Sequence, residues 1–498
     1  MNLSAIIAAR HRATAGFSAE AQDYFDRLDT AGDTTYVDYK QPLANYIDSL
    51  VTLGGAYWDD MNSAASFVGV GIQGVTVPLR DGMTALTNNN FVAGDLNQLT
   101  GLKGGNTKEL ATGISDNQFT TSNASASVYA TEAATTGAHL SNDYNNGAVS
   151  LRVGSPTFVC LRGLATNTSI VTAGVTGLIG LTRNTDTDLD GRASQTNVTE
   201  ANAGTLPRNS EIFVFSRNAA QFADSRLATY HLGSALNLAT LEGLQETLLS
   251  EIRTAHTFVA AASYFSRLAA AGDTTHVAYK QPLTNYITSL VELGGAYWDN
   301  MNSATSFVGV GIQGITVPLR DGMTVPTNNN FVSGDLDQLT GLKGNASTKY
   351  LGTGLLATQI GTQNDVSISV YVTVPYITAS RYYSGAFLGG DTLHLWGPSG
   401  ASRSSAFGSL QTFGTQAMSG VVGVSRSDSS SQTSRSNQTN YAVGNNSVAP
   451  IAADYSVFAS SGLGETDARL ATYHAGPALD LATLEGLQDT LISEIAAI

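Results

Sequence analysis

Two copies of a glycine-rich motif have the spacing that binds nucleotides in other proteins. "GVGIQG" occupies residues 69–74 and recurs at 309–314, and the G-x-G-x-x-G pattern lets backbone amides bind a pyrophosphate where a helix opens after the last glycine. Here "VTVPLR" follows, in which Val75 and Val77 alternate and Pro78 is excluded from a helix interior. The motif therefore predicts a bend or bulge within β structure.

A second segment has the residue types of a calcium loop. "DTDLDG", Asp186–Gly191, carries alternate carboxylates, which can converge on a hard cation. The twelfth position counted from Asp186 is Asn197, where a bidentate glutamate would stand, and the second half of the chain has "SDSSSQT" in the corresponding region. We expect an acidic hairpin tip, and the sequence leaves open whether Asp186–Asp190 binds calcium.

The chain lacks the arrangements that would indicate an enzyme. Glycosidases need two carboxylates at a fixed separation, and neither E-x-D-x-x-E nor E-x-D-x-E occurs. His231 and His474 recur in "RLATYH", but no duplicated Ser or Cys stands in an elbow-like motif beside them. The single cysteine, Cys160 in "TFVCLR", excludes a disulfide within the chain and is typical of a buried strand residue. We expect no catalytic residue, no cofactor and no metal.

Trp58 and Trp298, each in "GGAYWD", are the aromatic residues most open to a glycan-contact interpretation. They lie at the end of a segment with helical spacing. Packing between this helical head and the β structure explains them better than stacking on a sugar.

Composition restricts the partners. Charged residues make up 13% of the chain and the net charge is −15, which disfavours nucleic acid. No apolar run reaches the ~18–20 residues of a membrane span. The start, "MNLSAIIAARHRA", has no basic residue before its apolar patch, so it is a poor secretion signal and indicates an N-terminal arm made in the cytoplasm.

The chain is an internal duplication. "YFDRLDTAGDTTYVDYKQPL" begins at Tyr24 and "YFSRLAAAGDTTHVAYKQPL" at Tyr264, and "RLATYH" with the helical segment after it ends both copies. This predicts an N-terminal arm (1–23), a first unit (24–252), a stiff, helical linker (253–263) and a second unit (264–498). The middle segments have diverged but keep short, alternating strand patterns, as in Val366–Val374.

The segments with alternating apolar residues and the segments with helical spacing together predict the fold class. Several alternating strands in each copy favour a mainly β fold with two tandem β-sandwich units. Helical spacing predicts helices at the start of each copy and one at its end, where Asn237 and Asp480 are candidate N-caps.

This layout resembles a family of bacteriophage virion proteins with a concanavalin A-like (laminin G-like) jelly-roll domain. The resemblance is carried by Tyr24–Arg27 with Ala31–Gly32 and by Asp224–Gly233, and in the second copy by Tyr264–Arg267, Ala271–Gly272 and Asp467–Gly476. It implies a non-enzymatic virion component (decoration, appendage or tail/adhesin protein) that contacts other virion proteins, forms homo-oligomers in a symmetric particle and attaches to host-surface glycan. The family's motifs mark fold and virion association, so no site residue is carried over.

Identical polar loops in both copies suggest a shared docking surface, because core packing alone tolerates surface drift. The protein-contact candidates are Arg80, Asp81, Asn88, Asn89 and Asn90, with Arg320, Asp321, Asn328, Asn329 and Asn330 in the second copy. A recent duplication is the alternative explanation. For the whole protein, a pair of lectin-like carbohydrate-binding modules and a divergent polysaccharide-degrading enzyme remain the competing functions.

Overall fold

The computed structural model describes residues 16–498 apart from several internal gaps. These are 121, 136, 143–148, 154–156, 162–167, 172–175, 194, 202–208, 218–220, 376–380, 388–392, 398–401, 409–410 and 414–417. The chain divides into two compact units, Met1–His256 and Thr257–Ile498. Most of the predicted N-terminal arm, residues 1–15, lies outside the described part, and helix α2 begins at Ala19, before the predicted start of the unit at Tyr24.

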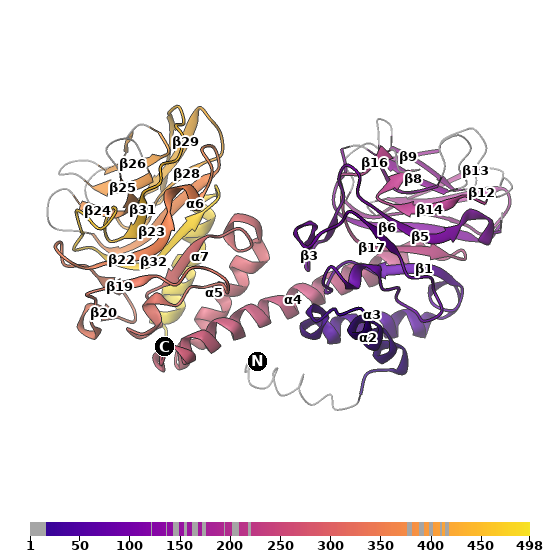
Figure 1. Ribbon diagram of the computed structural model, residues 1–498, viewed down its shortest axis with the longest axis horizontal. Coiled ribbons are helices and arrows are strands. Elements are labelled where there is room, and N and C mark those ends of the chain that lie inside the picture. Colours follow the sequence, from indigo (N-terminus) through magenta and orange to yellow (C-terminus); the bar gives the residue numbers. More distant parts are fainter. Residues whose placement is uncertain are drawn as a thin grey trace. The chain divides into compact units, whose positions relative to one another are not determined.

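Unit 1 contains two sheets (Figure 1). The first consists, in spatial order, of β13 (Thr196–Ala201), β12 (Asp188–Ala193), β11 (Gly177–Arg183), β6 (Ala124–Glu132), β17 (Arg226–Gly233), β4 (Gly101–Lys103) and β3 (Leu96–Asn97), with β1 (Met61–Ser66) also paired to β17. The second consists of β10 (Thr168–Val171), β9 (Thr157–Leu161), β8 (Val149–Val153), β7 (Gly137–Ser141), β14 (Glu211–Val214), β5 (Glu109–Ser115) and β2 (Thr87–Asn89), with β15 (Ser216–Arg217) and β16 (Gln221–Phe222) beside β7. Cys160 lies in β9, as predicted for a strand residue, and its side chain is outside the described part.

Unit 2 repeats this plan. Its first sheet consists of β20 (Leu336–Asp337), β21 (Gly341–Lys343), β32 (Arg469–Gly476), β23 (Val366–Val374), β28 (Gly420–Arg426), β29 (Ser431–Ser436) and β30 (Thr439–Gly444), with β18 (Ser303–Ser306) on β32. Its second sheet consists of β19 (Thr327–Asn329), β22 (Tyr350–Leu356), β31 (Asp454–Val457), β24 (Arg381–Ala386), β25 (Leu393–Gly397), β26 (Ser402–Ala406) and β27 (Gln411–Phe413).

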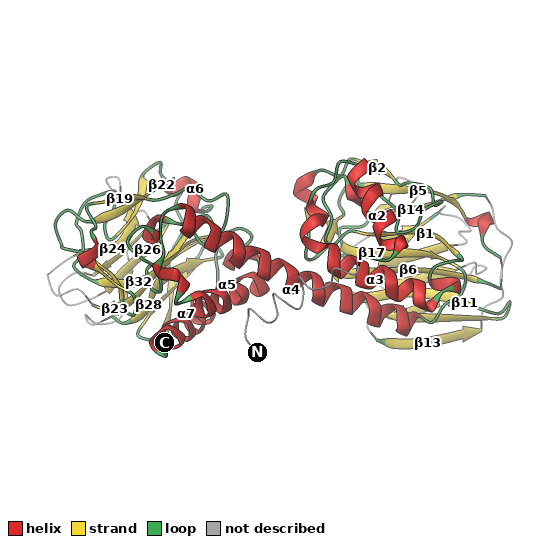
Figure 2. Ribbon diagram, turned by 90° about the horizontal axis from the view of Figure 1, so that it is seen from below, coloured by secondary structure: helices red, strands yellow, loops and turns green. Residues whose placement is uncertain are grey.

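The long helices come from the two ends of each repeat, whereas the four-residue α6 lies between β22 and β23 of unit 2 (Figure 2). They are α2 (Ala19–Thr30), α3 (Lys40–Leu53), α4 (Leu238–Ala270), α5 (Lys280–Leu293), α6 (Ala357–Ile360) and α7 (Leu481–Ala496), with 3₁₀ turns η1 (Thr35–Tyr39), η2 (Gly55–Tyr57), η3 (Gly74–Thr76), η4 (Ala93–Asp95), η5 (Asp116–Gln118), η6 (Thr275–Val277), η7 (Gly295–Tyr297), η8 (Gly314–Thr316) and η9 (Ser333–Asp335). Residues 253–263, the predicted linker, lie inside α4. No helix in the described part of the chain is long and apolar enough to cross a membrane.

The predicted N-caps start the last helix of each unit. The side chain of Asn237 accepts hydrogen bonds from the backbone nitrogens of Ala239 and Thr240, at 2.9 and 3.2 Å. Asp480 accepts one from the nitrogen of Ala482 at 3.0 Å. These bonds satisfy amides that would otherwise lack a partner at a helix end.

Apolar residues from both sheets of a unit share one core. In unit 2 this core includes Val370 and Val372 from the first sheet and Tyr383, Leu395 and Val457 from the second, all at most 1% exposed. The prediction of a mainly β fold built from antiparallel sheets is confirmed, although among the described strands β16 pairs with β7 in parallel. Two sheets around a common core are consistent with a β-sandwich.

Candidate functional site

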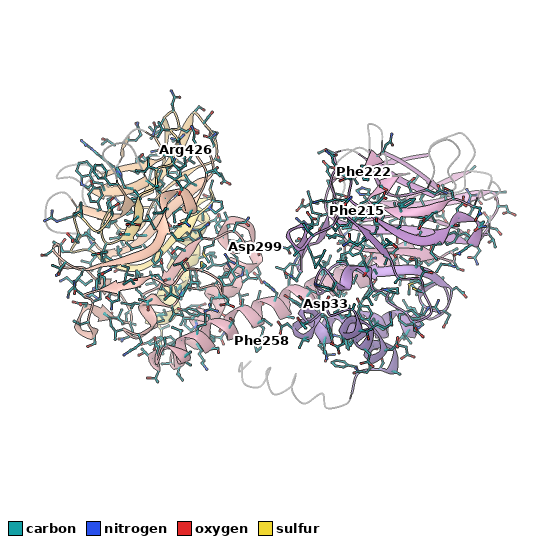
Figure 3. All side chains as sticks on the ribbon, in the orientation of Figure 1. Asp33, Phe215, Phe222, Phe258, Asp299 and Arg426 are labelled. Atoms are coloured by element: carbon teal, nitrogen blue, oxygen red, sulfur yellow. The ribbon has the colours of Figure 1, made fainter. Side chains whose placement is uncertain are left out.

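The glycine motif of unit 1 surrounds a carboxylate of the same chain. Asp33, which follows helix α2 and is 1% exposed, accepts a hydrogen bond from the backbone nitrogen of Gly71 at 2.6 Å through Oδ2. Its Oδ1 accepts another from the nitrogen of Thr35 at 2.8 Å. Figure 3 labels Asp33 near the helices of unit 1. One amide of the motif, that of Gly71, is therefore directed at a carboxylate of the same chain.

The last glycine of the motif is required by this close approach. A Cβ atom built on Gly74 would lie 2.2 Å from Oδ2 of Asp33 and 2.9 Å from Leu28. Unit 2 repeats the arrangement, with the nitrogen of Gly311 2.7 Å from Oδ2 of Asp273 and a Cβ on Gly314 at 2.2 Å from the same oxygen. The motif forms a tight internal turn, and its last glycine opens a short 3₁₀ turn, η3 or η8, in place of the α-helix that a dinucleotide site requires.

Arginines hold the "PLRDGMT" segments in place from inside each unit. Arg27 on α2 donates to the backbone oxygens of Pro78 and Leu79. Arg80, within the segment, donates from Nη2 to the oxygen of Met61 at 2.7 Å. Unit 2 repeats these bonds: Arg267 donates to the oxygens of Pro318 and Leu319 at 3.0 and 2.9 Å, and Arg320 donates to that of Met301 at 2.7 Å.

Among the described residues, Arg80 and Arg320 do not form ion pairs with Asp81 and Asp321, the residues that follow them in the chain. Among the ion pairs between described residues, the partner of Asp321 is Arg267 on α4, with Nη1 and Oδ1 3.8 Å apart. The arginine beside each aspartate is directed to a backbone carbonyl instead, so it serves the fold. Asp81 is exposed and the side chain of Asp321 is 82% exposed.

The "TNNNF" segments also make internal hydrogen bonds. Asn88 receives a bond from the nitrogen of Phe91 at 2.9 Å, and Asn328 receives the equivalent bond at 2.9 Å. Asn90 and Asn330 have φ angles of 71° and 69°, a region that asparagine tolerates better than most residues.

The side chains of these last asparagines reach a neighbouring loop, while the middle ones differ between units. Asn90 Nδ2 lies 2.7 Å from the oxygen of Thr107, and Asn330 Nδ2 lies 2.9 Å from that of Thr348. Asn89 donates to Glu109, whereas Asn329 donates to Thr327. The identity of these loops therefore has a structural cause, and it does not by itself indicate docking.

Trp58 and Trp298 are not available as glycan contacts. Their exposed fractions are 7% and 4%, so their ring faces are not offered to a sugar. The alternative, packing between the helical head and the sheets, is the one that fits.

The "DTDLDG" segment forms part of a hairpin between β11 and β12, as its sequence pattern predicts. β11 ends at Arg183 and β12 begins at Asp188, so Asp186 is in the exposed turn. The Oδ2 of Asp188 accepts a hydrogen bond from Thr187 Oγ1 at 3.1 Å. Within the described part of the chain, no three His, Cys, Asp or Glu side chains are grouped as metal ligands.

A cavity of about 590 Å³ in unit 2 is lined by part of the predicted docking segment. Its lining includes Arg320, Met323, Asp299, Gln359 and Asp365, and Asp299 is labelled in Figure 3. Burial lowers the pKa of the Arg320 guanidinium, and the charges of Asp299 and Asp321 oppose this shift. The cavity thus offers a half-buried cation beside carboxylates, which suits a polar partner.

Sequence reasoning missed a buried ion pair that attaches the last helix of each unit to its sheet. Arg192 on β12 contacts Glu242 on α4 at 2.6 Å, with side chains 11% and 3% exposed. In unit 2, Arg435 on β29 contacts Glu485 on α7 at 2.5 Å. The available signal was that both arginines keep equivalent places in otherwise diverged segments.

His231 and His474 are core residues. They lie in β17 and β32 and are 3% and 2% exposed. Burial lowers the pKa of each imidazole to about 4. Their imidazoles are therefore neutral at pH 7.

No family model and no curated protein matches the chain. Among solved structures, it is similar to the botulinum neurotoxin serotype D binding domain, with a TM-score of 0.29, 6% identity, and coverage of 38% of this chain and 51% of that one. It is similar to Trypanosoma rangeli sialidase with a TM-score of 0.30, 11% identity and coverage of 71% and 61%. The binding domain of botulinum neurotoxin DC in complex with SialylT gives a TM-score of 0.29, 8% identity and coverage of 84% and 99%. Overlaps at these TM-scores establish neither a shared fold nor a shared activity.

Proposed function

We propose that the chain is a non-enzymatic structural subunit of a bacteriophage virion, built from two concanavalin A-like jelly-roll units that dock through the same surface on each unit. The resemblance described above suggests the virion. In both units the residues that carry it belong to the scaffold: Tyr24 and Tyr264 are fully buried, and Arg27 and Arg267 hold the following loop.

The observation that carries the proposal is a set of exposed apolar side chains that recurs at equivalent positions. Three pairs match between the units and are 45% to 61% exposed: Val37 with Val277, Leu53 with Leu293, and Val92 with Val332. Their backbone positions, in η1 or η6, at the end of α3 or α5, and before η4 or η9, are also the same. Exposed apolar residues carry an energetic penalty in water that burial against a partner removes.

These exposed apolar residues are better evidence for a docking surface than the polar loops are. Arg80 and Asn88 are identical to their counterparts and have internal hydrogen bonds that explain the identity. The six exposed apolar side chains are more than two-fifths accessible to solvent in each unit. A second copy of this chain is the occupant we propose, because exposed apolar positions that occur twice per chain suit a repeating symmetric assembly.

The test compares matched and unmatched exposed residues. One variant carries Val37→Thr, Leu53→Gln and Val92→Thr with the same changes at Val277, Leu293 and Val332. The control variant carries Val325→Thr and Leu463→Gln. These are exposed positions of unit 2 whose counterparts in unit 1, Ala85 and Ala220, have no large apolar side chain.

Both variants are measured by light scattering after size-exclusion chromatography and by their amount in gradient-purified particles. We expect the sixfold variant to stay folded, to lose self-association and to be absent from particles, while the control behaves as wild type. Normal incorporation of the sixfold variant would contradict the docking surface. Absence of the wild-type chain from purified particles would contradict the virion role.

A further inference from the structure

A hollow in unit 1 lies where three outer strands meet the start of α4. It has a volume of about 380 Å³ and is lined by β11, β12, β13 and residues 235–239. Strand register places three polar residues in one row across its floor, because Thr182 pairs with Asp190 and Asp190 pairs with Thr199. Asp190 is the last carboxylate of the "DTDLDG" motif.

The polar groups of the row have different roles. The Oγ1 of Thr182 accepts a hydrogen bond from the nitrogen of Leu236 at 3.1 Å, which fixes the chain just before α4. Asn237 caps the first amides of the helix, so the helix end is satisfied within the protein. Thr199 Oγ1 donates to Oδ1 of Asp190 at 2.6 Å, which orients the carboxylate without filling the hollow.

Unit 2 shows which members of the row the fold requires. The equivalent row is Ser425, Thr433 and Ala442, since β28 pairs Ser425 with Thr433 and β29 pairs Thr433 with Ala442. Ser425 keeps the bond to the residue before the helix, from the nitrogen of Leu479 at 3.1 Å. Of these two rows, only that of unit 1 contains a carboxylate, Asp190, and the hydroxyl that orients it, Thr199. The same strands and helix form without them, so Asp190 and Thr199 are not needed for folding.

The chemistry of the hollow selects a class of ligand. The carboxylate of Asp190 accepts hydrogen bonds, and so does the hydroxyl of Thr199, whose proton is donated to Asp190. The side-chain amides of Asn184 and Asn197 can donate or accept them, and Val198, Leu236 and Leu238 add apolar surface. A net charge of −15 and the neighbouring Asp186 and Asp188 disfavour anions. The volume lies within the usual ~300–1,000 Å³ of small-ligand pockets.

We propose that this hollow of unit 1 binds a neutral saccharide ring, with Asp190 accepting hydrogen bonds from its hydroxyl groups. The ring's C–H face then lies against the apolar lining, and its hydroxyls meet Asp190, Thr199 and Asn184. The corresponding row of unit 2 lacks the carboxylate and does not bind the same ligand. This inference does not depend on the virion role or on the docking surface.

The test uses the full-length chain and a panel of methyl glycosides of neutral hexoses, N-acetylhexosamines and pentoses, with binding followed by saturation-transfer NMR and calorimetry. The variant Asp190→Thr with Thr199→Ala gives unit 1 the residues of unit 2, and its circular dichroism and melting are expected to match wild type. Thr433→Ala in unit 2 is the matched control.

We expect at least one glycoside to bind wild type and the control equally, and to bind the double variant at least tenfold more weakly. Absence of binding by every glycoside in the panel would overturn the proposal, as would binding that survives the double substitution. Weaker binding in the Thr433→Ala control would also overturn it, by placing the site in unit 2.

Discussion

The carboxylate of Asp33 and the backbone nitrogen of Gly71 lie 2.6 Å apart, although 38 residues separate them in the chain. Asp273 and Gly311 repeat this relationship at 2.7 Å with the same separation. A buried carboxylate needs such partners, because leaving it without hydrogen bonds in the interior would be strongly unfavourable. Two stretches that look unrelated in sequence, "AGDTT" and "GVGIQG", therefore form one structural element.

Gly74→Ala should destabilise unit 1. Its new methyl group would lie 2.2 Å from Oδ2 of Asp33, and relieving such an overlap in a packed core costs about 1–3 kcal/mol. Gly243→Ala, in the interior of α4 with no atom within 4 Å of the new Cβ, is the control and should stabilise by about 0.5–1 kcal/mol. Urea unfolding measures both, and equal stabilities for the two variants would contradict the tight turn.

Glu242→Gln should be strongly destabilising, because it leaves the guanidinium of Arg192 buried without its anion. Breaking one partner of a buried pair costs about 3–5 kcal/mol, whereas replacing both by apolar residues is often near neutral. Arg192→Met with Glu242→Leu should therefore lie closer to wild type than Glu242→Gln alone. Lys103→Gln, at a more exposed pair with Glu132, is the control and should change the free energy of unfolding by less than about 1 kcal/mol.

Stability should fall when the pH is lowered through the range in which unfolded histidines gain protons. The pKa of His231 and His474 is lowered from 6.5 to about 4 by burial, so the unfolded state binds more protons between these values and stability rises with pH there. Each pKa unit corresponds to about 1.4 kcal/mol. Denaturant melts at a series of pH values check this. His231→Gln with His474→Gln should reduce the slope, and His139 and His394, whose pKa burial also lowers to about 4, should keep part of it. A flat wild-type profile between about pH 6.5 and 5 would contradict the prediction.

Calcium should leave the thermal stability unchanged. The hairpin that contains Asp186 and Asp188 is exposed, and Asp188 is occupied by a threonine hydroxyl. A ligand at a hundred times its dissociation constant would stabilise the protein by about 2.7 kcal/mol. Differential scanning calorimetry with and without calcium tests this, and a rise in Tm that Asp188→Ala abolishes would show that the hairpin is a cation site.

The features that follow from local pattern could be predicted from the sequence. The alternation in Val366–Val374 became β23, and Asn237 and Asp480 became N-caps, because each depends on neighbours a few residues away. The duplication also gave the mainly β class in both units.

Contacts between distant segments could not be predicted in the same way. Asp33 with Gly71 and Arg192 with Glu242 depend on how strands and helices meet, and neither residue type reveals its partner. Identical polar residues such as Arg80 and Asn88 were assigned to a shared surface, yet they make internal hydrogen bonds. A residue that is identical in both copies can be required for folding or for binding. Sequence identity alone does not distinguish these two causes, whereas the contacts of the residue in the structure do.

The pairing of β1 with β17 in unit 1, and of β18 with β32 in unit 2, determines when the first sheet of each unit can finish forming. Ser63 in β1 faces Leu232 in β17, and the equivalent pair in unit 2 is Ser303 in β18 with Ala475 in β32. Because these partners are about 170 residues apart, forming the first sheet of each unit requires closing a long chain segment, which slows folding. During synthesis on the ribosome, β1 emerges long before β17 and stays unpaired until β17 has been synthesised. Nascent chains stalled before Gly233 should therefore be susceptible to proteases across the whole first repeat, and chains released just beyond α4 should become resistant in a single step.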